Sequence, residues 1–259
     1  MTGQLSKLLN DKDVLCGMLC RDPTAIEIEL MAQAGCDLVW VDLEHAPFNP
    51  SEAAALFRSI VHLGMAPLAR IVELTRTQVQ VLLDAGAENF VLPDTRNVSQ
   101  AAELVRLSKF PPVGERGVSS TSATFSYSIG TDIEKALQEA NTATHLMIQV
   151  ESDEGLENLD AICAIPQIDM VTVGPADWSI GLGLYGPDKE AIMGDKTDAV
   201  VAKAVAAGKV VAMMTGSEEQ ARRYIKMGAR ILFAGVDISF KRRAFNEAMA
   251  PLQAARQSR

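Results

Sequence analysis

The sequence predicts an α/β protein, a single (β/α)8 TIM barrel, and three observations support this. Short β-branched or apolar runs alternate with longer stretches of helical period, which is typical of a parallel sheet covered by helices. Eight such units fit into 259 residues, close to the usual length of about 250 for this barrel. No Gly-rich dinucleotide turn follows an early strand, which disfavours an open doubly wound sheet. Because no Pro/Gly/Ser-rich linker divides the chain, we expect one domain over residues 1–259.

The expected strands follow one another at regular intervals. They cover residues 14–20, 38–44, 66–71, 89–93, 144–151, 170–175, 210–215 and 231–236. Helical patterns lie near residues 24–34, 51–63, 76–85, 97–109, 155–164, 188–207, 217–227 and 238–255. Four of the units contain a similar short sequence in which a glycine stands between the helix and the strand. These sequences are AGCDLVW, AGAENFVLP, AGKVVAMM and MGARILFAG. Glycine ends helices in this way because it lacks the Cβ that penalises positive φ.

One connection interrupts this order. Between the fourth and fifth strands lie helix 97–109, a Ser/Thr-rich segment over 110–130 and a second helical stretch over 131–142. Both helices are expected to run from the catalytic end of the barrel to the opposite end, so the segment between them should climb back. We therefore expect Val118–Tyr127 near a catalytic mouth, its own or that of a neighbouring subunit.

Composition limits the classes of partner. The formal net charge is -9 and aromatic residues make up only 5%, which disfavours binding to nucleic acid or to an anionic membrane. No apolar run approaches the ~20 residues that span a bilayer. The N-terminal MTGQLSKLLNDKD lacks the features of a signal peptide. We expect a cytoplasmic protein whose partner is a small-molecule substrate.

The positions of the cysteines and lysines also disfavour covalent mechanisms. The cysteines show neither disulfide nor zinc spacing and are Cys16, Cys20, Cys36 and Cys163. Cys16 and Cys20 share parity, which predicts small core residues on one strand face. A Schiff-base aldolase needs a lysine on a barrel strand, but Lys209 stands at the wrong end of its strand. Thr215–Ser217 is either a phosphate-binding nest or, with Gln220, an ordinary capping box.

Polar side chains stand at the carboxyl ends of four strands, where barrel enzymes carry their chemistry. They are Asp42, Glu44 and His45 after the second strand, Arg70 after the third, Gln149 and Glu151 after the fifth, and Asp177 after the sixth. Glu151 and Asp177 should end adjacent strands, about 4.8 Å apart. Two such carboxylates can share a divalent cation with waters and substrate oxygens. Alternatively, both acids stabilise helix N-termini.

His45 and Arg70 each have two interpretations. His45 could act as a base whose tautomer a neighbouring carboxylate fixes, or it could be a surface histidine before a proline turn. Arg70 could offset the charge of a developing oxyanion, or it could form a structural ion pair. Combined with a Lewis-acidic metal, the two side chains form a coherent site for breaking a carbon–carbon bond.

The set DLEHAP, Arg70, LLDAGA, PPVGERG, QVE and GPADWS, in this order and spacing, resembles the class II pyruvate aldolases of the HpcH/HpaI family. The resemblance runs from about residue 14 to residue 240. It implies a barrel of the phosphoenolpyruvate/pyruvate-binding type, assembled as a hexamer built as a trimer of dimers. It also implies reversible cleavage of a 4-hydroxy-2-oxo acid to pyruvate and an aldehyde. The pyruvate enolate would be stabilised by Mg²⁺, Mn²⁺ or Co²⁺.

The resemblance also assigns roles to residues of this chain. It implies Glu151 and Asp177 as the metal ligands, and substrate contacts from Gln149 and from Gly174, Pro175, Ala176 and Asp177. His45 would be the general base and Arg70 would stabilise the enolate. The catalytic set is completed by Asp42 and by Asp84, which matches the residue that raises the basicity of the active-site histidine.

The chain departs from the family in ways that affect the aldehyde acceptor. Asp94 and Arg96 add charge where the family usually carries apolar residues, and Trp178 replaces a usual leucine. The identity of the aldehyde therefore stays open. One alternative is a related lyase acting on a CoA thioester, which needs a basic or adenine-binding surface near the mouth. The other is a non-catalytic barrel, which the retention of His45 and Arg70 beside both carboxylates disfavours.

Overall fold

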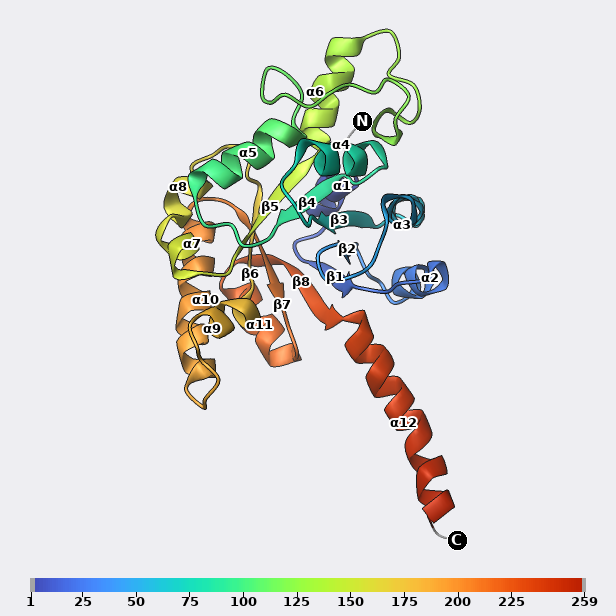
Figure 1. Cartoon of the computed structure of the whole chain (residues 1–259), viewed down its shortest axis with the longest axis vertical. Helices are drawn as coiled ribbons and strands as arrows, with labels where there is room; N and C mark the ends of the chain where they lie inside the picture. Colours follow the sequence, from blue (N-terminus) through green and yellow to red (C-terminus); the bar gives the residue numbers. More distant parts are fainter. Residues whose placement is uncertain (1–2, 258–259) are drawn as a thin grey trace.

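A computed structural model describes residues 3–257, and its eight strands pair in parallel and in sequence order into a closed barrel (Figure 1). The strands are β1 (Leu15–Cys20), β2 (Leu38–Asp42), β3 (Ala66–Arg70), β4 (Asn89–Leu92), β5 (His145–Val150), β6 (Met170–Val173), β7 (Val210–Met214) and β8 (Ala229–Val236). Strand β8 pairs with β1 and closes the ring. The predicted (β/α)8 barrel is confirmed.

Helices alternate with these strands. The predicted ones are α2 (Ala25–Gln33), α3 (Pro50–His62), α4 (Arg76–Asp84), α5 (Val98–Ser108), α6 (Ile133–Ala143), α7 (Asp153–Glu157) with α8 (Leu159–Cys163), α10 (Lys189–Ala206), α11 (Glu218–Lys226) and α12 (Asp237–Gln257). Unpredicted are α1 (Gln4–Asp11), the 3-10 turn η1 (Ala123–Phe125) and α9 (Pro175–Gly181). The helix-terminating glycines of the four repeated sequences adopt positive φ as expected, at Gly35, Gly86, Gly208 and Gly228. Within residues 3–257 no helix combines the length and the hydropathy of a bilayer span.

Two apolar layers hold the barrel together. One lies between the strands and the surrounding helices, and the other fills the interior. Inside, Trp40 packs edge-on against Phe233, with ring centroids 5.2 Å apart. Helix α1 covers the N-terminal end, where the fully buried Leu5 joins the interior layer. Helix α1 thus covers the N-terminal end of the barrel. The polar groups that the strands can present to a ligand lie at the carboxyl end.

Helix α12 leaves the barrel instead of lying along it, and Figure 1 shows it projecting into solvent. A helix in the usual position would cover the outer faces of β1 and β8. Cys20 is buried, but Cys16, which shares that outer face of β1, is exposed. The prediction that both cysteines are core residues is therefore wrong for Cys16, because the helix that would cover it points away.

The segment over 110–130 lies at the N-terminal end of the barrel, not at its mouth. Thr124 donates from Oγ1 to the carbonyl of Leu83, 2.9 Å away, and that residue is near the end of α4. Phe125 is buried with Phe110 and Ala140. Helix α6 contacts α1 beyond the strand ends, so the chain has no need to climb back. The expectation that Val118–Tyr127 lies near the mouth of its own chain is therefore wrong.

Candidate active site

The carboxyl ends of the strands surround an open cavity of about 440 Å³. It gathers residues that follow the carboxyl ends of β2, β4, β5 and β6. Its lining includes Glu44, His45, Asp94, Arg96, Glu151, Asp177 and Trp178. Residues far apart in sequence therefore meet here, because parallel strands in a closed ring bring their ends to one face.

Asp42 anchors the β2–β3 side of this mouth. It is completely buried, and its Oδ1 and Oδ2 accept from Arg70 Nε and Nη2 at 2.9 and 2.6 Å. The backbone N–H groups of Glu44 and His45 also donate to Oδ1. Burial by itself raises the pKa of Asp42, but the hydrogen bonds and charge of Arg70 outweigh it and lower that pKa overall. Asp42 is therefore an ionised anchor that orients Arg70 and the turn carrying His45.

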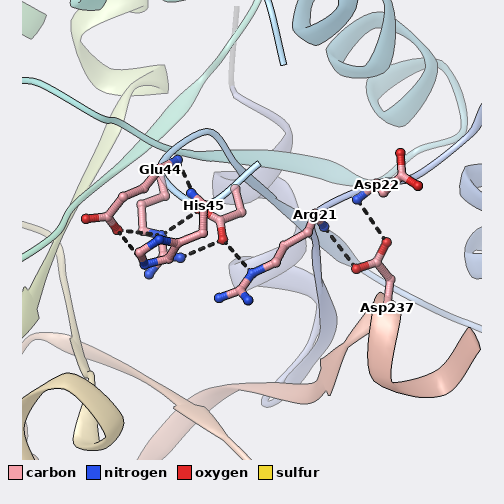
Figure 2. Close-up of polar contacts among 7 residues, drawn as sticks. Arg21, Asp22, Glu44, His45 and Asp237 are labelled. Atoms are coloured by element: carbon pink, nitrogen blue, oxygen red, sulfur yellow. Dashed lines mark hydrogen bonds and ion pairs between the residues drawn. The ribbon is translucent and has the colours of Figure 1, made fainter. Parts of the chain in front are cut away.

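Glu44 links the arginine to the histidine. Its Oε2 lies 3.2 Å from Arg70 Nε and 3.6 Å from His45 Nε2. Figure 2 shows Glu44 and His45 side by side. The ring of His45 is 44% exposed, so it can reach a ligand. The carboxylate beside the histidine ring is that of Glu44, whereas Asp42 contacts only the backbone of that residue. Arg70 has both predicted properties, since it forms a buried ion pair and stands at the mouth.

Glu151 lies opposite, among like charges. The pKa of Glu151 is raised to about 7: burial is the largest cause, the nearby carboxylates of Asp177 and Glu44 contribute to the rise, and the Asp94 N–H and Arg70 oppose it. That N–H donates to Oε1 at 3.0 Å. Repulsion of this kind is relieved either by a proton or by a cation.

Gln149 and Gly174 shape the space beside Glu151. The Oε1 atom of Gln149 is buried and has no hydrogen-bond partner among residues 3–257. A Cβ on Gly174 would stand 2.6 Å from Gln149 Nε2 and closer still to the Glu151 carboxylate. Glycine at position 174 thus leaves room for both side chains. The unpaired Gln149 oxygen adds a neutral oxygen ligand to the two carboxylates.

The alternative that both acids serve helix N-termini holds for only one of them. Ser152 is the N-cap of α7 and accepts from the Gly155 N–H, so Glu151 caps no helix. Asp177 lies in the first turn of α9, where the helix dipole favours an acid. No cluster of three or more His, Cys, Asp or Glu side chains within residues 3–257 has the arrangement of a metal site. A cation here would therefore take two carboxylates and complete its shell with other oxygens.

The residues that depart from the family lie around this cavity. Asp94 has a positive φ of 41°, which aims its N–H at Glu151. Arg96 Nε donates to both oxygens of Asp94 at 3.0 and 2.9 Å. Trp178 is almost fully buried, and its Nε1 donates to Asp153 at 2.9 Å. Asp94 and Arg96 are thus paired with each other, and the Trp178 indole forms a fixed wall of the cavity.

Asp84 is not beside His45. It ends α4 immediately before β4, at the opposite end of the barrel, where its Oδ1 accepts from Arg116 Nη2 at 3.1 Å. The role that the resemblance implies for Asp84, raising the basicity of the active-site histidine, stays a prediction. A contact within one chain does not provide it, because the loop before a strand and the loop after a strand face opposite ends. His145 is also at that end and bonds Ser6 Oγ at 2.7 Å. Among the described histidines, the mouth holds His45.

The Thr215–Ser217 turn is a helix cap. Ser217 Oγ accepts from the Gln220 N–H, and Gln220 Oε1 accepts from the Gly216 N–H. Ser217 is therefore the N-cap, as the capping-box interpretation expects, but Gln220 returns its bond to the Gly216 N–H instead of the Ser217 N–H. These groups are occupied by protein partners. Sequence reasoning overlooked Arg21, whose Nε donates to Asp42 Oδ2 at 3.0 Å. Its position directly after β1 could have revealed it, because the strand-end argument applies equally to the first strand.

Known proteins resemble the chain over most of its length. The profile of the HpcH/HpaI aldolase/citrate lyase family matches residues 18–244. A hydroxypyruvate/pyruvate aldolase of Pseudomonas aeruginosa is 34% identical over 85% of this chain and 81% of its own length. A 4-hydroxy-2-oxo-heptane-1,7-dioate aldolase of Salmonella arizonae is 35% identical over 81% of this chain and 79% of its own. The crystal structure of a family protein from Burkholderia cenocepacia superposes with a TM-score of 0.87, 31% identity, and coverage of 97% and 100% of the two chains.

Proposed function

Because this chain belongs to the HpcH/HpaI aldolase/citrate lyase family, and is thus a carbon–carbon lyase, we propose that it is a metal-dependent pyruvate aldolase. It cleaves a 4-hydroxy-2-oxo acid to pyruvate and an aldehyde, and it catalyses the reverse addition. The relatives named above act on substrates of this kind. One observation carries the proposal. The acids Glu151 and Asp177 lie together on one side of the mouth, and Arg70 and His45 lie on the other side.

The residues on the β5–β6 side fit a divalent cation. Glu151 and Asp177 supply hard oxygen donors, which Mg²⁺, Mn²⁺ and Co²⁺ accept. The unpartnered Gln149 Oε1 and the space left by Gly174 are further reasons for this assignment. When bound, the cation would act as a Lewis acid toward the keto oxygen of the substrate. The backbone of Pro175, Ala176 and Asp177 begins α9, and the free N–H groups of Ala176 and Asp177 favour the substrate carboxylate, since Pro175 has no N–H.

The side chains on the β2–β3 side have distinct tasks. Arg70, fixed by Asp42, offsets negative charge as it develops on the keto oxygen. His45 is the exposed base and moves the proton of the C4 hydroxyl group as the carbon–carbon bond breaks. Glu44 lies close enough to orient the imidazole. Asp42 acts through Arg70 and the β2 turn, so its role is positioning.

Asp84 can act on His45 only from a second subunit, since it lies at the far end of its own barrel. We therefore keep the expected homo-oligomer, a hexamer arranged as a trimer of dimers, as part of the proposal. Val118–Tyr127, next to Asp84 at that end, would then approach a neighbour's mouth. Helix α12 supports association, because its exposed apolar side chains include Phe245, Met249 and Leu252. A cytoplasmic location stays a prediction.

Light scattering tests the assembly. We expect an oligomeric mass for the wild type and a smaller species for Phe245→Asp. The reactivity of Cys16 with a thiol reagent is a second measure of association. A subunit that covers the exposed outer face of β1 should protect Cys16 from the reagent. A monomeric wild type with full activity would contradict the proposed role of Asp84.

A coupled assay tests the reaction. Several 4-hydroxy-2-oxo acids and CoA thioesters are offered, and released pyruvate is followed through lactate dehydrogenase. We expect pyruvate from the oxo acids, loss of activity in a chelator, and recovery when Mg²⁺, Mn²⁺ or Co²⁺ is returned. Cleavage of thioesters alone would favour the CoA lyase, and full activity in the chelator would contradict the metal-dependent mechanism.

A further inference from the structure

Arg21 lies at the mouth on the side opposite the two carboxylates. It follows β1, which in the closed ring is four strands away from β5. Its Nε and Arg70 Nη2 both donate to Asp42 Oδ2, at 3.0 and 2.6 Å. The side chain is 40% exposed, so it is accessible from the mouth. The mechanism above assigns it no task.

The position of Arg21 is fixed at both ends. Its backbone N–H donates to Asp237 Oδ1 at 2.9 Å, and the N–H of Asp22 donates to the other oxygen at 3.1 Å. Asp237 is only 3% exposed and also accepts from Lys241 Nζ. Figure 2 shows the Arg21 side chain extending from this clamp toward the cluster of Glu44 and His45, with Asp22 pointing away. The guanidinium is thus held in place before any ligand arrives.

Arg21 keeps hydrogen-bonding capacity that its protein partner does not use. Its Nε donates to Asp42, and within residues 3–257 its terminal nitrogens have no hydrogen-bond partner. That acid is already paired by two hydrogen bonds to Arg70. The contrast with Arg96 is clear, because both oxygens of Asp94 engage that arginine. Arg21 and Arg70 share the buried Asp42 carboxylate, and Arg70 also meets Glu44. The unused hydrogen-bonding capacity at this corner is therefore that of the Arg21 terminal nitrogens.

We propose that Arg21 binds a carboxylate at the far end of the acceptor aldehyde. This inference rests on the proposed aldolase function. With pyruvate at β5–β6 and the aldehyde oxygen near His45 on the β2 side, an acceptor chain continues toward β1. The terminal nitrogens of arginine match the geometry of a carboxylate and can bind both its oxygens. Arg21 is therefore a specificity residue that selects an ω-carboxy aldehyde over a neutral one.

A substrate pair tests this. Aldols of pyruvate with an ω-carboxy aldehyde and with its methyl ester differ only in the distal charge, and kcat/KM is measured for each. We expect Arg21→Met to lower the ratio of acid to ester by roughly 10–100-fold, the loss for hydrogen bonds to a charged group. Arg21→Lys should recover part of the ratio, because it restores charge without the planar fork. Arg222→Met, at an exposed helical ion pair, is the matched control and should leave the ratio unchanged.

Three outcomes would overturn the inference. Equal losses for acid and ester in Arg21→Met would show that Arg21 only supports Asp42. No loss of kcat/KM for either substrate would show that it does not meet the acceptor. Failure of the proposed function is distinguishable, since the wild type would then release pyruvate from neither substrate and would not exchange the pyruvate methyl protons, which overturns both proposals.

Discussion

The two ends of the barrel both contain a cavity and a buried acid, but the surroundings of those acids differ. The N-terminal cavity is the larger, about 610 Å³ against about 440 Å³ at the mouth. Burial raises the pKa of Glu88 there, and His145 and Lys7 oppose the rise. Burial also raises the pKa of Glu151, but its neighbours Asp177 and Glu44 increase the rise.

Charged groups at the N-terminal end have partners within the protein, although Arg116 Nε has none among residues 3–257. Glu88 accepts from the Gln4 N–H at 2.9 Å, Arg116 donates to Thr124 Oγ1 at 2.7 Å, and Lys109 donates to the carbonyl of Asn141 at 2.6 Å. At the mouth, Gln149 Oε1 is unpaired and the acids repel one another. Size therefore does not identify the reactive end. Charge that the fold leaves uncompensated does, because a proton or a bound cation is needed to relieve it.

The strongest way to break this comparison is to neutralise one acid at each end. Glu151→Gln should reduce pyruvate release by on the order of 1000-fold, because the charge that holds the cation is removed. Glu88→Gln, the matched control, should leave turnover within about twofold, since its carboxyl has a raised pKa and meets no substrate. Steady-state assays at saturating metal compare them. Equal losses in the two variants would contradict the comparison.

A second variant sharpens the contrast in charge. Asp42→Asn should destabilise the protein by about 3 kcal/mol, because it leaves two arginines without their shared carboxylate. Since the folded pKa of Asp42 is lowered, this stabilisation is complete above the unfolded value near 3.8 and disappears as pH falls through the folded value. Urea unfolding at pH 7 and pH 3 measures it. Asp160→Asn, at an exposed ion pair, should change stability by less than about 0.5 kcal/mol. A constant difference across pH would contradict the ionised anchor.

A third pair separates the two sides of the mouth. Arg70→Ala should slow exchange of the pyruvate methyl protons by roughly 100-fold, because enolate formation loses its charge stabilisation. His45→Ala should reduce cleavage more than it reduces that exchange, since the base serves the aldehyde side. Proton exchange is followed by NMR and cleavage by the coupled assay. Small, equal losses in both reactions for both variants would show that neither residue acts at the site.

The smallest expected effect comes from adding one methyl group. Gly174→Ala places a Cβ against Glu151 and Gln149, and a displacement of about 1 Å there should cost up to about 100-fold in turnover. Gly194→Ala, where the added Cβ meets nothing within 4 Å, should be neutral. Activity in Gly174→Ala equal to that of the control would show that the space beside Glu151 is not used.

Local patterns predicted the eight strands and the gathering of Asp42, His45, Arg70 and Glu151 at one end. This succeeded because side-chain alternation and chain direction in a parallel barrel are properties of short segments. The position of α12 and of segment 110–130 could not be predicted in the same way. Each depends on which distant surface an apolar face finds, and Cys16 and Val118–Tyr127 were misplaced for that reason. Arg21 was missed because the strand-end argument was not applied to β1.

Calorimetric titration of Mn²⁺ tests the central claim most directly. Wild type and Glu88→Gln should each bind Mn²⁺ with the same affinity, and Glu151→Gln should bind it at least roughly 100-fold more weakly, because one of two charged ligands is gone. Equal Mn²⁺ affinity in all three proteins, or no binding to the wild type, would contradict a cation site at the mouth.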